Sequence, residues 1–364
     1  MNLTETICVE LGSRSYNIVV RGCGLEDLAE YAGSFDTHQV VIITDTNVAE
    51  LYLDRVSQIL GALISRVDVV KVPAGEASKS IRQLESLWSQ FLKLEVDRQT
   101  IVFALGGGVV GDLAGFAAAS FARGVPFVQL PTSLLAQVDS SVGGKTGINL
   151  ADAKNMVGAF WQPEFVLIDP ETLNTLDDSN FTSGLAEVVK YGVIMDEPFF
   201  SELENSAAAI SQRDSSALTK MIAQCCRLKA QVVAEDETET TGRRAILNYG
   251  HTFGHAIENV LGYGTYLHGH AISIGMQCAA WLANHLGMID AATAARQTEL
   301  LKSLGCPVKL RGADLDKLVA AMHRDKKVER GKLRLILPTE IGAVELVDAP
   351  EDGLLWRAFE ANCE

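Results

Sequence analysis

The histidines of this chain are the residues whose types and spacing most directly suggest chemistry. Four of the seven histidines lie between His251 and His270. Imidazole is the commonest metal ligand in proteins, and its ordinary pKa lies nearest neutrality. His251 and His255 are four residues apart, so a helix would place them on one face, one turn from each other. The cluster predicts a metal centre or an acid–base centre. For an isolated pair, two surface histidines would be the better interpretation.

A glycine-rich turn suggests a second kind of chemistry. Residues 106–111 read Gly-Gly-Gly-Val-Val-Gly between a strand pattern and a helix pattern, where backbone N–H groups could face a pyrophosphate. The turn follows the third strong strand, and residues 126–135 lack the acidic residue expected about 20 positions downstream. On the glycines alone, a tight packing turn is an equal interpretation. Asp45 and Asn47, at the end of an earlier strand, favour a nucleotide site, with Asp45 as the ribose carboxylate.

A lysine-containing segment invites comparison with a phosphate-binding P-loop. Residues 142–146 read Val-Gly-Gly-Lys-Thr, but the P-loop spacing requires glycine at position 139, where this chain has Asp139. We therefore discount an ATPase or a kinase. Lys145 and Lys154 lie in a Gly- and Ser-rich stretch that could bind an anion, although a solvated charge is the default interpretation of a single lysine.

Glu187 is a carboxylate within an apolar helical pattern, between Ala186 and Val188. Its burial would be costly unless the carboxylate is paired or bound to a metal. The alternative interpretation is a surface ion pair with Lys190, three residues further on.

The composition excludes several classes of protein. A formal net charge of −15 argues against nucleic acid or an anionic membrane as a partner, although an anionic small molecule could bind where the cations gather. The seven cysteines contain no C-x-x-C pair, which is typical of reduced thiols in a cytoplasmic protein. The first ten residues do not resemble a signal peptide, and no apolar run reaches membrane-spanning length.

The elements that would carry these residues change in character along the chain. β-Branched runs alternate with helical patterns in the first half, which predicts βαβ units and a parallel sheet. These runs cover residues 40–44, 67–72, 101–105, 126–130 and 165–169. From about residue 183 the patterns are helical, and only a late hairpin is expected. The helical patterns cover 217–234, 251–260, 271–286 and 292–304, and the hairpin strands 333–337 and 344–347. We expect an α/β domain over residues 1–178 and a mainly α-helical domain over 179–364.

In order along the chain, the motifs resemble those of the 3-dehydroquinate synthases, a family of sugar-phosphate cyclases. The resemblance covers nearly the whole chain. The matching segments are Pro73-Ala-Gly-Glu-Ala-Ser-Lys79, Gly106-Gly-Gly-Val-Val-Gly-Asp112, Pro131-Thr-Ser133, Asp139-Ser-Ser-Val-Gly-Gly-Lys-Thr-Gly-Ile-Asn149, Lys154-Asn-Met-Val-Gly-Ala-Phe160, Ala186-Glu-Val-Val-Lys190, Arg244-Ala-Ile-Leu-Asn-Tyr-Gly-His-Thr-Phe-Gly-His-Ala-Ile-Glu258 and Asp325-Lys-Lys327. Each segment alone is moderately specific for the family, and the segments together in this order are a strong indication of the resemblance.

The resemblance implies a Rossmann-like, NAD-binding N-terminal domain, a helical metal- and substrate-binding C-terminal domain, and an active site between them. A divalent metal, zinc with cobalt as an alternative, would be bound by Glu187, His251 and His268, an open ligand set suited to polarising vicinal hydroxyls. His255 would then face the substrate. NAD would contact Asp45, Asn47, Glu76, Lys79, Gly107, Gly108, Val109, Val110, Gly111, Asp112, Thr132, Ser133, Lys145, Lys154, Thr172, Leu173, Asn174 and Thr175. The anionic substrate would contact Arg123, Asp139, Lys145, Asn155, Lys190, Lys229, Arg244, Asn248, His255 and Lys326.

The activity implied by the resemblance converts 3-deoxy-D-arabino-heptulosonate 7-phosphate to 3-dehydroquinate and phosphate, in the shikimate pathway to aromatic amino acids. NAD transiently oxidises a hydroxyl, phosphate is eliminated, the hydride returns, the ring opens, and an intramolecular aldol step closes the carbocycle. Three alternatives stay open: a cyclase whose substrate lacks the carboxylate, a metal-dependent polyol dehydrogenase, and a non-catalytic NAD-binding protein. Family resemblance alone also predicts a homodimer.

Three departures from the family pattern are visible. His268-Gly-His270 stands where the family usually has His-Gly-Glu, so His270 leaves an alternative ligand assignment open. Ser133 stands where threonine is common, and residues 238–242 contain one extra residue.

Overall fold

The computed structural model describes residues 3–150, 153–262, 264–324 and 333–364, which form two units. The first unit contains Met1–Leu176 and Leu218–Thr238, and the second contains Asp177–Ala217 and Glu239–Glu364. The chain therefore crosses from one unit to the other three times, whereas the single boundary expected at residue 178 would require one crossing.

The first unit is built on a seven-stranded sheet in the order β1-β2-β9-β6-β5-β3-β4. The strands are β1 (Thr4–Val9), β2 (Tyr16–Arg21), β3 (Gln39–Asp45), β4 (Arg66–Val72), β5 (Ile101–Gly106), β6 (Phe127–Pro131) and β9 (Phe165–Ile168). All neighbouring strands are parallel except β1 and β2. The parallel sheet predicted for the first half of the chain is confirmed.

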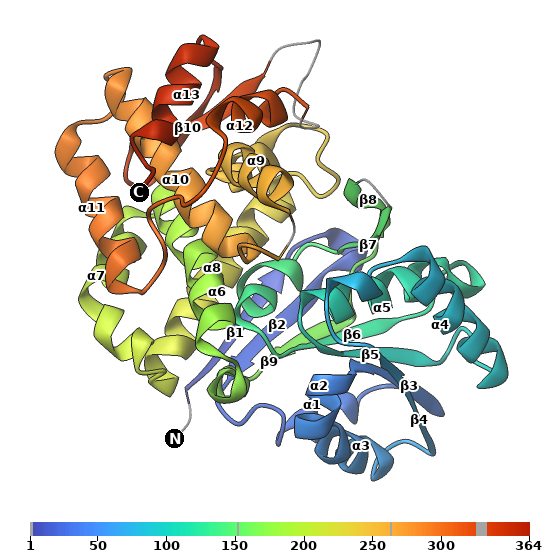
Figure 1. The fold of residues 1–364 in the computed structure, drawn as a ribbon. Coiled ribbons are helices and arrows are strands. Elements are labelled where there is room, and N and C mark those ends of the chain that lie inside the picture. The colour runs from blue at the N-terminus through green and yellow to red at the C-terminus, as the bar shows by residue number, and fades with distance from the viewer. Residues whose placement is uncertain (1–2, 151–152, 263, 325–332) are drawn as a thin grey trace. The chain divides into compact units, whose positions relative to one another are not determined.

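Alternate side chains of the sheet pack against helices on its two faces. Val40 and Ile42 of β3 join a core with α1 (Leu28–Ala32) and α3 (Asp54–Gly61). Val41 and Ile43 join a separate core with α4 (Ile81–Lys93) and α5 (Gly108–Ser120). A strand directs successive side chains to opposite faces, so a run that is apolar throughout is buried on both. Figure 1 shows the two groups of helices on either side of β3 and β5.

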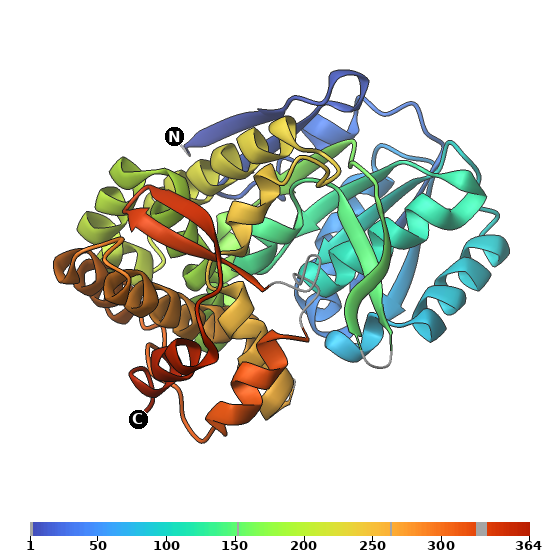
Figure 2. The same cartoon turned by 90° about the horizontal axis from the view of Figure 1, so that it is seen from above.

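An antiparallel hairpin of the first unit is formed by β7 (Lys145–Leu150) and β8 (Ala153–Phe160), drawn in green in Figure 2. The sequence suggested only a Gly- and Ser-rich loop here. The glycines instead allow the two strands to approach, because a Cβ on Gly158 would lie 2.0 Å from the carbonyl oxygen of Thr146.

Helix α8 (Ser215–Glu235) has most of its length in the first unit, although the sequence division assigned it to the helical domain. The thiol of Cys226 donates to the carbonyl oxygen of Gln137 at 3.3 Å, and the ammonium of Lys229 contacts Asp139. Periodicity identified the helix correctly, but it contains no information on which core receives the apolar face.

The second unit is mainly helical. Its elements are α6 (Asp178–Met195), α7 (Glu197–Ser211), α9 (His251–Leu261), α10 (His268–His285), α11 (Ala291–Ser303), α12 (Leu315–Met322), the hairpin of β10 (Arg334–Glu340) and β11 (Ala343–Asp348), and α13 (Asp352–Glu360). Helix α10 packs against α6, α9, α11 and α13 and is buried along most of its length. The predicted late hairpin is confirmed.

Aspartates begin several of these helices. Asp177, Asp196, Asp290 and Asp314 each accept a hydrogen bond from a backbone N–H of the first turn of the helix that follows. Such N-caps satisfy N–H groups that have no partner within the helix. In the part of the chain that the structure describes, every helix is too short or too polar to cross a bilayer.

Candidate functional site

Glu187, in the middle of α6, is a fully buried carboxylate. Its side chain has 0% exposure, and Lys190, one turn later, has 1%. The two form an ion pair, so the pair expected from the sequence exists, but its assignment to the surface was wrong. Among the described residues, neither carboxylate oxygen has a hydrogen-bond partner of acceptable geometry. A buried carboxylate in this state favours a bound cation.

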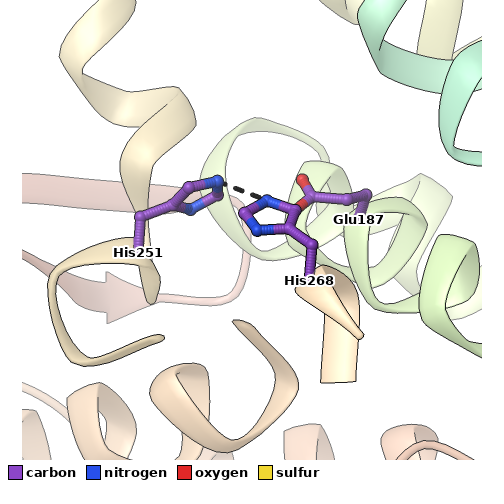
Figure 3. Close-up of side chains that lie close together, drawn as sticks. All are labelled: Glu187, His251 and His268. Carbon is purple, nitrogen blue, oxygen red and sulfur yellow. Dashed lines mark ion pairs between the residues drawn. The ribbon is translucent and has the colours of Figure 1, made fainter. Parts of the chain in front are cut away.

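Two imidazole rings face this carboxylate. The Nε2 atoms of His251 and His268 lie 3.6 Å and 3.7 Å from Oε1 of Glu187. Figure 3 shows the three side chains converging from α6, α9 and the first residue of α10. The centroids of the two rings are 5.4 Å apart.

The other nitrogen of each ring has a partner that fixes the orientation of the ring. Nδ1 of His251 lies 3.0 Å from the carbonyl oxygen of Tyr249, and Nδ1 of His268 lies 3.1 Å from Oε2 of Glu258. Since both partners are acceptors, each Nδ1 carries the proton and each Nε2 presents a lone pair toward Glu187. Metal-binding histidines typically have this arrangement, in which a carbonyl or carboxylate orients the ligand.

The donor set fits a divalent metal. The ligand atoms of Glu187, His251 and His268 all lie within 4.8 Å of one another. Two imidazole nitrogens and a carboxylate form a common catalytic zinc set that leaves positions open for water or substrate.

A second, overlapping group contains His255, Glu258 and His268, whose ligand atoms are also within 4.8 Å of one another. In this group Glu258 already accepts a hydrogen bond from His268. Within the described parts of the chain, the oxygens of Glu187 have the ion-pair contact with Lys190 but no hydrogen bond of acceptable geometry. The Glu187 group is therefore the better metal site. His255 lies one turn after His251 on α9, with ring centroids 5.5 Å apart, beside that site.

The first turn of α10 packs closely against α6 and is hydrogen-bonded to it. The backbone N–H of Gly269 donates to Oγ of Ser183 at 3.0 Å, and a Cβ on Gly269 would lie 1.8 Å from the carbonyl oxygen of Ser183. Nε2 of His270 lies 2.9 Å from Oγ1 of Thr182, and burial lowers the pKa of His270. These contacts hold His268 opposite Glu187. Among the described residues, His270 belongs to neither of the two groups of potential metal ligands.

The first unit places the expected nucleotide contacts at one edge of its sheet. β3, β5, β6 and β9 are parallel, so Asp45, the Gly106–Gly108 turn, Thr132 and the segment around Thr172 follow strand ends on the same side. Asp45 accepts hydrogen bonds from the backbone N–H groups of Asn47 and Val48. The glycines also have a packing role, because a Cβ on Gly111 would lie 2.7 Å from Oε1 of Gln129.

Lys79, Asp112 and Asn155 meet in the first unit. Nζ of Lys79 donates to Oδ2 of Asp112 at 2.6 Å and to Oδ1 of Asn155 at 2.5 Å. Burial raises the pKa of Asp112, and the ammonium of Lys79 opposes that rise. Asp139 and Lys229 form a second pair in this unit, between a π-helical turn and α8.

The remaining expected residues have varied surroundings. Arg244 is almost fully buried in the 3₁₀ segment Arg243–Asn248, which also contains Asn248. Lys145 begins β7 and Lys154 lies on β8. Arg123 follows α5 at the end opposite the glycine turn, about 20 Å along a helix of this length. The structure thus does not bring Arg123 together with the glycine turn. Lys326 lies outside the described residues.

Comparison with known proteins decides the family. A model of the 3-dehydroquinate synthase N-terminal domain matches residues 69–183, and a model of the 3-dehydroquinate synthase C-terminal domain matches residues 184–328. The chain belongs to the 3-dehydroquinate synthase family. It is 51% identical to the 3-dehydroquinate synthase of Rhodopirellula baltica over 360 residues, covering 96% of each chain. It is 46% identical to that of Shewanella loihica, covering 98% of this chain and 99% of the relative.

Solved structures of related cyclases have the same fold. A 2-deoxy-scyllo-inosose synthase complexed with carbaglucose-6-phosphate, NAD+ and Co2+ matches with a TM-score of 0.88 and 27% identity, covering 99% of this chain and 100% of that one. The 2-epi-5-epi-valiolone synthase of Streptomyces hygroscopicus, with NAD+ and Zn2+ bound, also has a TM-score of 0.88 and 27% identity, with 97% and 98% coverage.

Several residues that matter in this member of the 3-dehydroquinate synthase family were given no role from the sequence. Glu258 and Tyr249 orient the two histidines, and Ser183 anchors α10. A signal for Glu258 was present, because it follows His251 by seven residues and His255 by three, on the same face of α9. Tyr249 acts through its backbone carbonyl, which no side-chain motif could indicate.

Proposed function

We propose that this chain converts 3-deoxy-D-arabino-heptulosonate 7-phosphate to 3-dehydroquinate and phosphate, with NAD recycled within each turnover and a divalent metal bound by Glu187, His251 and His268. The observation that carries the proposal is the buried Glu187 carboxylate faced by two oriented Nε2 atoms, in a chain that is 51% identical to a named 3-dehydroquinate synthase over nearly its full length. The reaction belongs to the shikimate pathway and makes the enzyme a carbon–oxygen lyase.

The chemistry divides between bound groups and the residues of the chain. When bound, NAD supplies a hydride acceptor that is regenerated, and the metal supplies a Lewis acid for vicinal hydroxyls. The carbonyl of Tyr249 and the carboxylate of Glu258 keep the two histidines in the tautomer that presents Nε2. His255, beside this centre, would move a proton at its ring nitrogens.

A set of cationic and polar residues would hold the anionic substrate. The cations are Lys190 and Arg244 of the second unit and Arg123, Lys145 and Lys229 of the first, and the polar residues Asn248, His255, Asp139 and Asn155 complete the set. A carboxylate and a phosphate need such local positive charge in a protein of net charge −15. We assign the nucleotide to the sheet edge that contains Asp45, Gly107–Asp112 and Thr172–Thr175, with Glu76, Lys79, Thr132, Ser133 and Lys154.

Three finer assignments belong to the proposal. Zinc is the metal, with cobalt as an alternative, because nitrogen and oxygen ligands suit both and related cyclases were solved with each. The location is cytoplasmic, in keeping with seven cysteines that no disulfide joins. The assembly is a homodimer, which rests on family resemblance alone.

A substrate panel tests the reaction. The enzyme should release phosphate from the heptulosonate 7-phosphate but not from a heptulose 7-phosphate that lacks the carboxylate. Turnover of the second compound alone would instead identify another sugar-phosphate cyclase. Steady NADH formation with simple polyols would instead identify a dehydrogenase. Structures of this fold that are only 13–16% identical to this chain are described as a putative alcohol dehydrogenase, a probable glycerol dehydrogenase and an NADH-dependent butanol dehydrogenase.

A further inference from the structure

Asn149 connects three separate segments of the first unit through hydrogen bonds. Its side-chain amide donates to Oε1 of Glu76 at 2.8 Å, and its Oδ1 accepts from the backbone N–H of Asn155 at 2.9 Å. Its own backbone N–H donates to the carbonyl oxygen of Lys79 at 2.9 Å. One residue of β7 is therefore bound both to the segment that contains Glu76 and Lys79 and to β8.

The β7–β8 ladder is irregular opposite Asn149. Ile148 pairs with Val157, and the next paired residue, Leu150, pairs with Ala153. Residues 154–156 are thus displaced from the ladder, and Asn155 has a left-handed backbone with φ of +53°. This conformation is costly for most residues with a side chain, although asparagine tolerates it better than most.

Burial does not impose this conformation, because Asn155 is exposed. Two hydrogen bonds hold it instead. Its backbone N–H is bonded to Asn149, and its side-chain oxygen accepts from Nζ of Lys79. Lys79 is 5% exposed and is paired with Asp112. A continuous chain of bonds therefore runs from Glu76 through Asn149, Asn155 and Lys79 to Asp112.

We propose that Asn149 is a positioning residue that sets the geometry of the NAD-contacting residues Glu76 and Lys79 together with the substrate-contacting Asn155. The inference rests on the proposed function, which gives those three residues their ligands. Asn149 acts through them: its side chain supplies one donor and one acceptor that match a carboxylate on one side and a backbone N–H on the other. Its loss frees Asn155 to leave the left-handed conformation, and that movement would take Oδ1 of Asn155 away from Nζ of Lys79.

Exchange of donor and acceptor tests this role. Asn149→Ala removes both side-chain bonds. Asn149→Asp keeps the acceptor for Asn155 but places a carboxylate against Glu76. In the double variant Asn149→Asp/Glu76→Gln, the amide at position 76 can donate to the carboxylate at position 149. The single variant Glu76→Gln completes the double-mutant cycle. Leu150→Ala is the matched control, since this neighbour on β7 is 50% exposed.

The measurements are the dissociation constant of NAD by direct titration, and kcat and KM for the heptulosonate phosphate. Asn149→Ala and Asn149→Asp should weaken NAD binding about tenfold, the effect of one lost hydrogen bond to a charged group. The double variant should bind NAD more tightly than Asn149→Asp, and Leu150→Ala should match the wild type. A structural role alone would lower the thermal midpoint of Asn149→Ala and leave the NAD affinity of the folded variant unchanged.

Wild-type NAD affinity and kinetics in Asn149→Ala would overturn the proposal. So would a double variant no better than Asn149→Asp, which also decides the question if Asn149→Ala fails to fold. A wild type that binds NAD but releases no phosphate would refute the proposed reaction and leave the NAD titrations as the test of Asn149.

Discussion

Nδ1 of His268 lies 3.1 Å from Oε2 of Glu258, while Nε2 of the same ring lies 3.7 Å from Oε1 of Glu187. The two carboxylates therefore have different roles toward one imidazole. Glu258 orients the ring, and Glu187 shares the space in front of Nε2 with His251.

Substitution of each carboxylate by its amide separates the ligand from the orienting residue. Glu258→Gln should lower metal affinity about 10- to 100-fold, as expected for loss of a group that orients a ligand. Glu187→Gln removes a direct ligand and should lower affinity further, to the point of strongly reduced metal content. A chelator-competition titration of both variants measures this order. The reverse order, with metal retained in Glu187→Gln, would favour the group His255, Glu258 and His268.

His255→Ala should keep the metal and lose turnover, because His255 lies beside the metal site without belonging to the Glu187 group. General acid–base residues typically contribute about 10²–10⁴-fold, so kcat should fall within that range. Elemental analysis of the purified variant, together with its kcat, checks both parts. Loss of the metal along with activity would make His255 a ligand, paired with His251 on α9.

Gly269→Ala should damage the metal site through packing. The added Cβ would lie 1.8 Å from the carbonyl oxygen of Ser183, so α10 must shift away from α6. Overpacking of this kind costs about 1–3 kcal/mol of stability, and the shift moves His268 away from Glu187. Metal affinity should therefore fall, and the apoprotein should unfold at a lower temperature. Gly353→Ala is the control, since a Cβ there would meet no atom within 4 Å. An unchanged metal affinity in Gly269→Ala would show that this contact does not set the geometry of the site.

The proposed metal ligands illustrate what the sequence could predict. The family resemblance proposed Glu187, His251 and His268 as ligands although Glu187 is 64 residues from the nearer histidine in the chain, and the structure brings all three together. Spacing alone had favoured His251 with His255, because helical periodicity relates only neighbours on one helix. Periodicity could not predict that α6 packs against α10, because that contact joins Ser183 and Gly269, which are far apart in the sequence.

The fold was predictable where a segment's own pattern decides its structure. The buried strands β3 and β5 are apolar on both faces, and their runs were visible. The β7–β8 hairpin was not, because its glycines serve close strand approach and its pairing is irregular at Asn149, which bonds to the displaced Asn155. The division at residue 178 likewise differs from the two units of the structure, which group residues 218–238 with the first unit. Within that unit these residues contact Gln137 and Asp139.

Asp177, the N-cap of α6, should make stability depend on pH. Hydrogen bonds from the side chain and backbone N–H of Asn180 lower the pKa of Asp177. A lowered folded-state pKa gives stabilisation that is complete above the unfolded value of about 3.9 and is lost as the pH falls through the folded value. Asp177→Asn keeps a capping acceptor but removes the charge, worth about 0.3–1 kcal/mol at a helix N-terminus.

The thermal midpoint of the apoprotein, measured with chelator present, checks this expectation. The wild type should unfold about 1–4 °C above Asp177→Asn near neutral pH, and the difference should shrink below about pH 4. Asp290→Asn, at the N-cap of α11, is a matched comparison on another helix whose cap pKa is also lowered. A wild-type advantage that does not change with pH would contradict the role given to the charge.

The most direct test of the proposed function is phosphate release from 3-deoxy-D-arabino-heptulosonate 7-phosphate in the presence of NAD, with and without chelator. Phosphate and 3-dehydroquinate should form in equal amounts while no NADH accumulates. The reaction should stop when the metal is removed and resume when zinc or cobalt is added back. NADH that accumulates in step with substrate consumption, or phosphate release that continues after complete metal removal, would contradict the proposal.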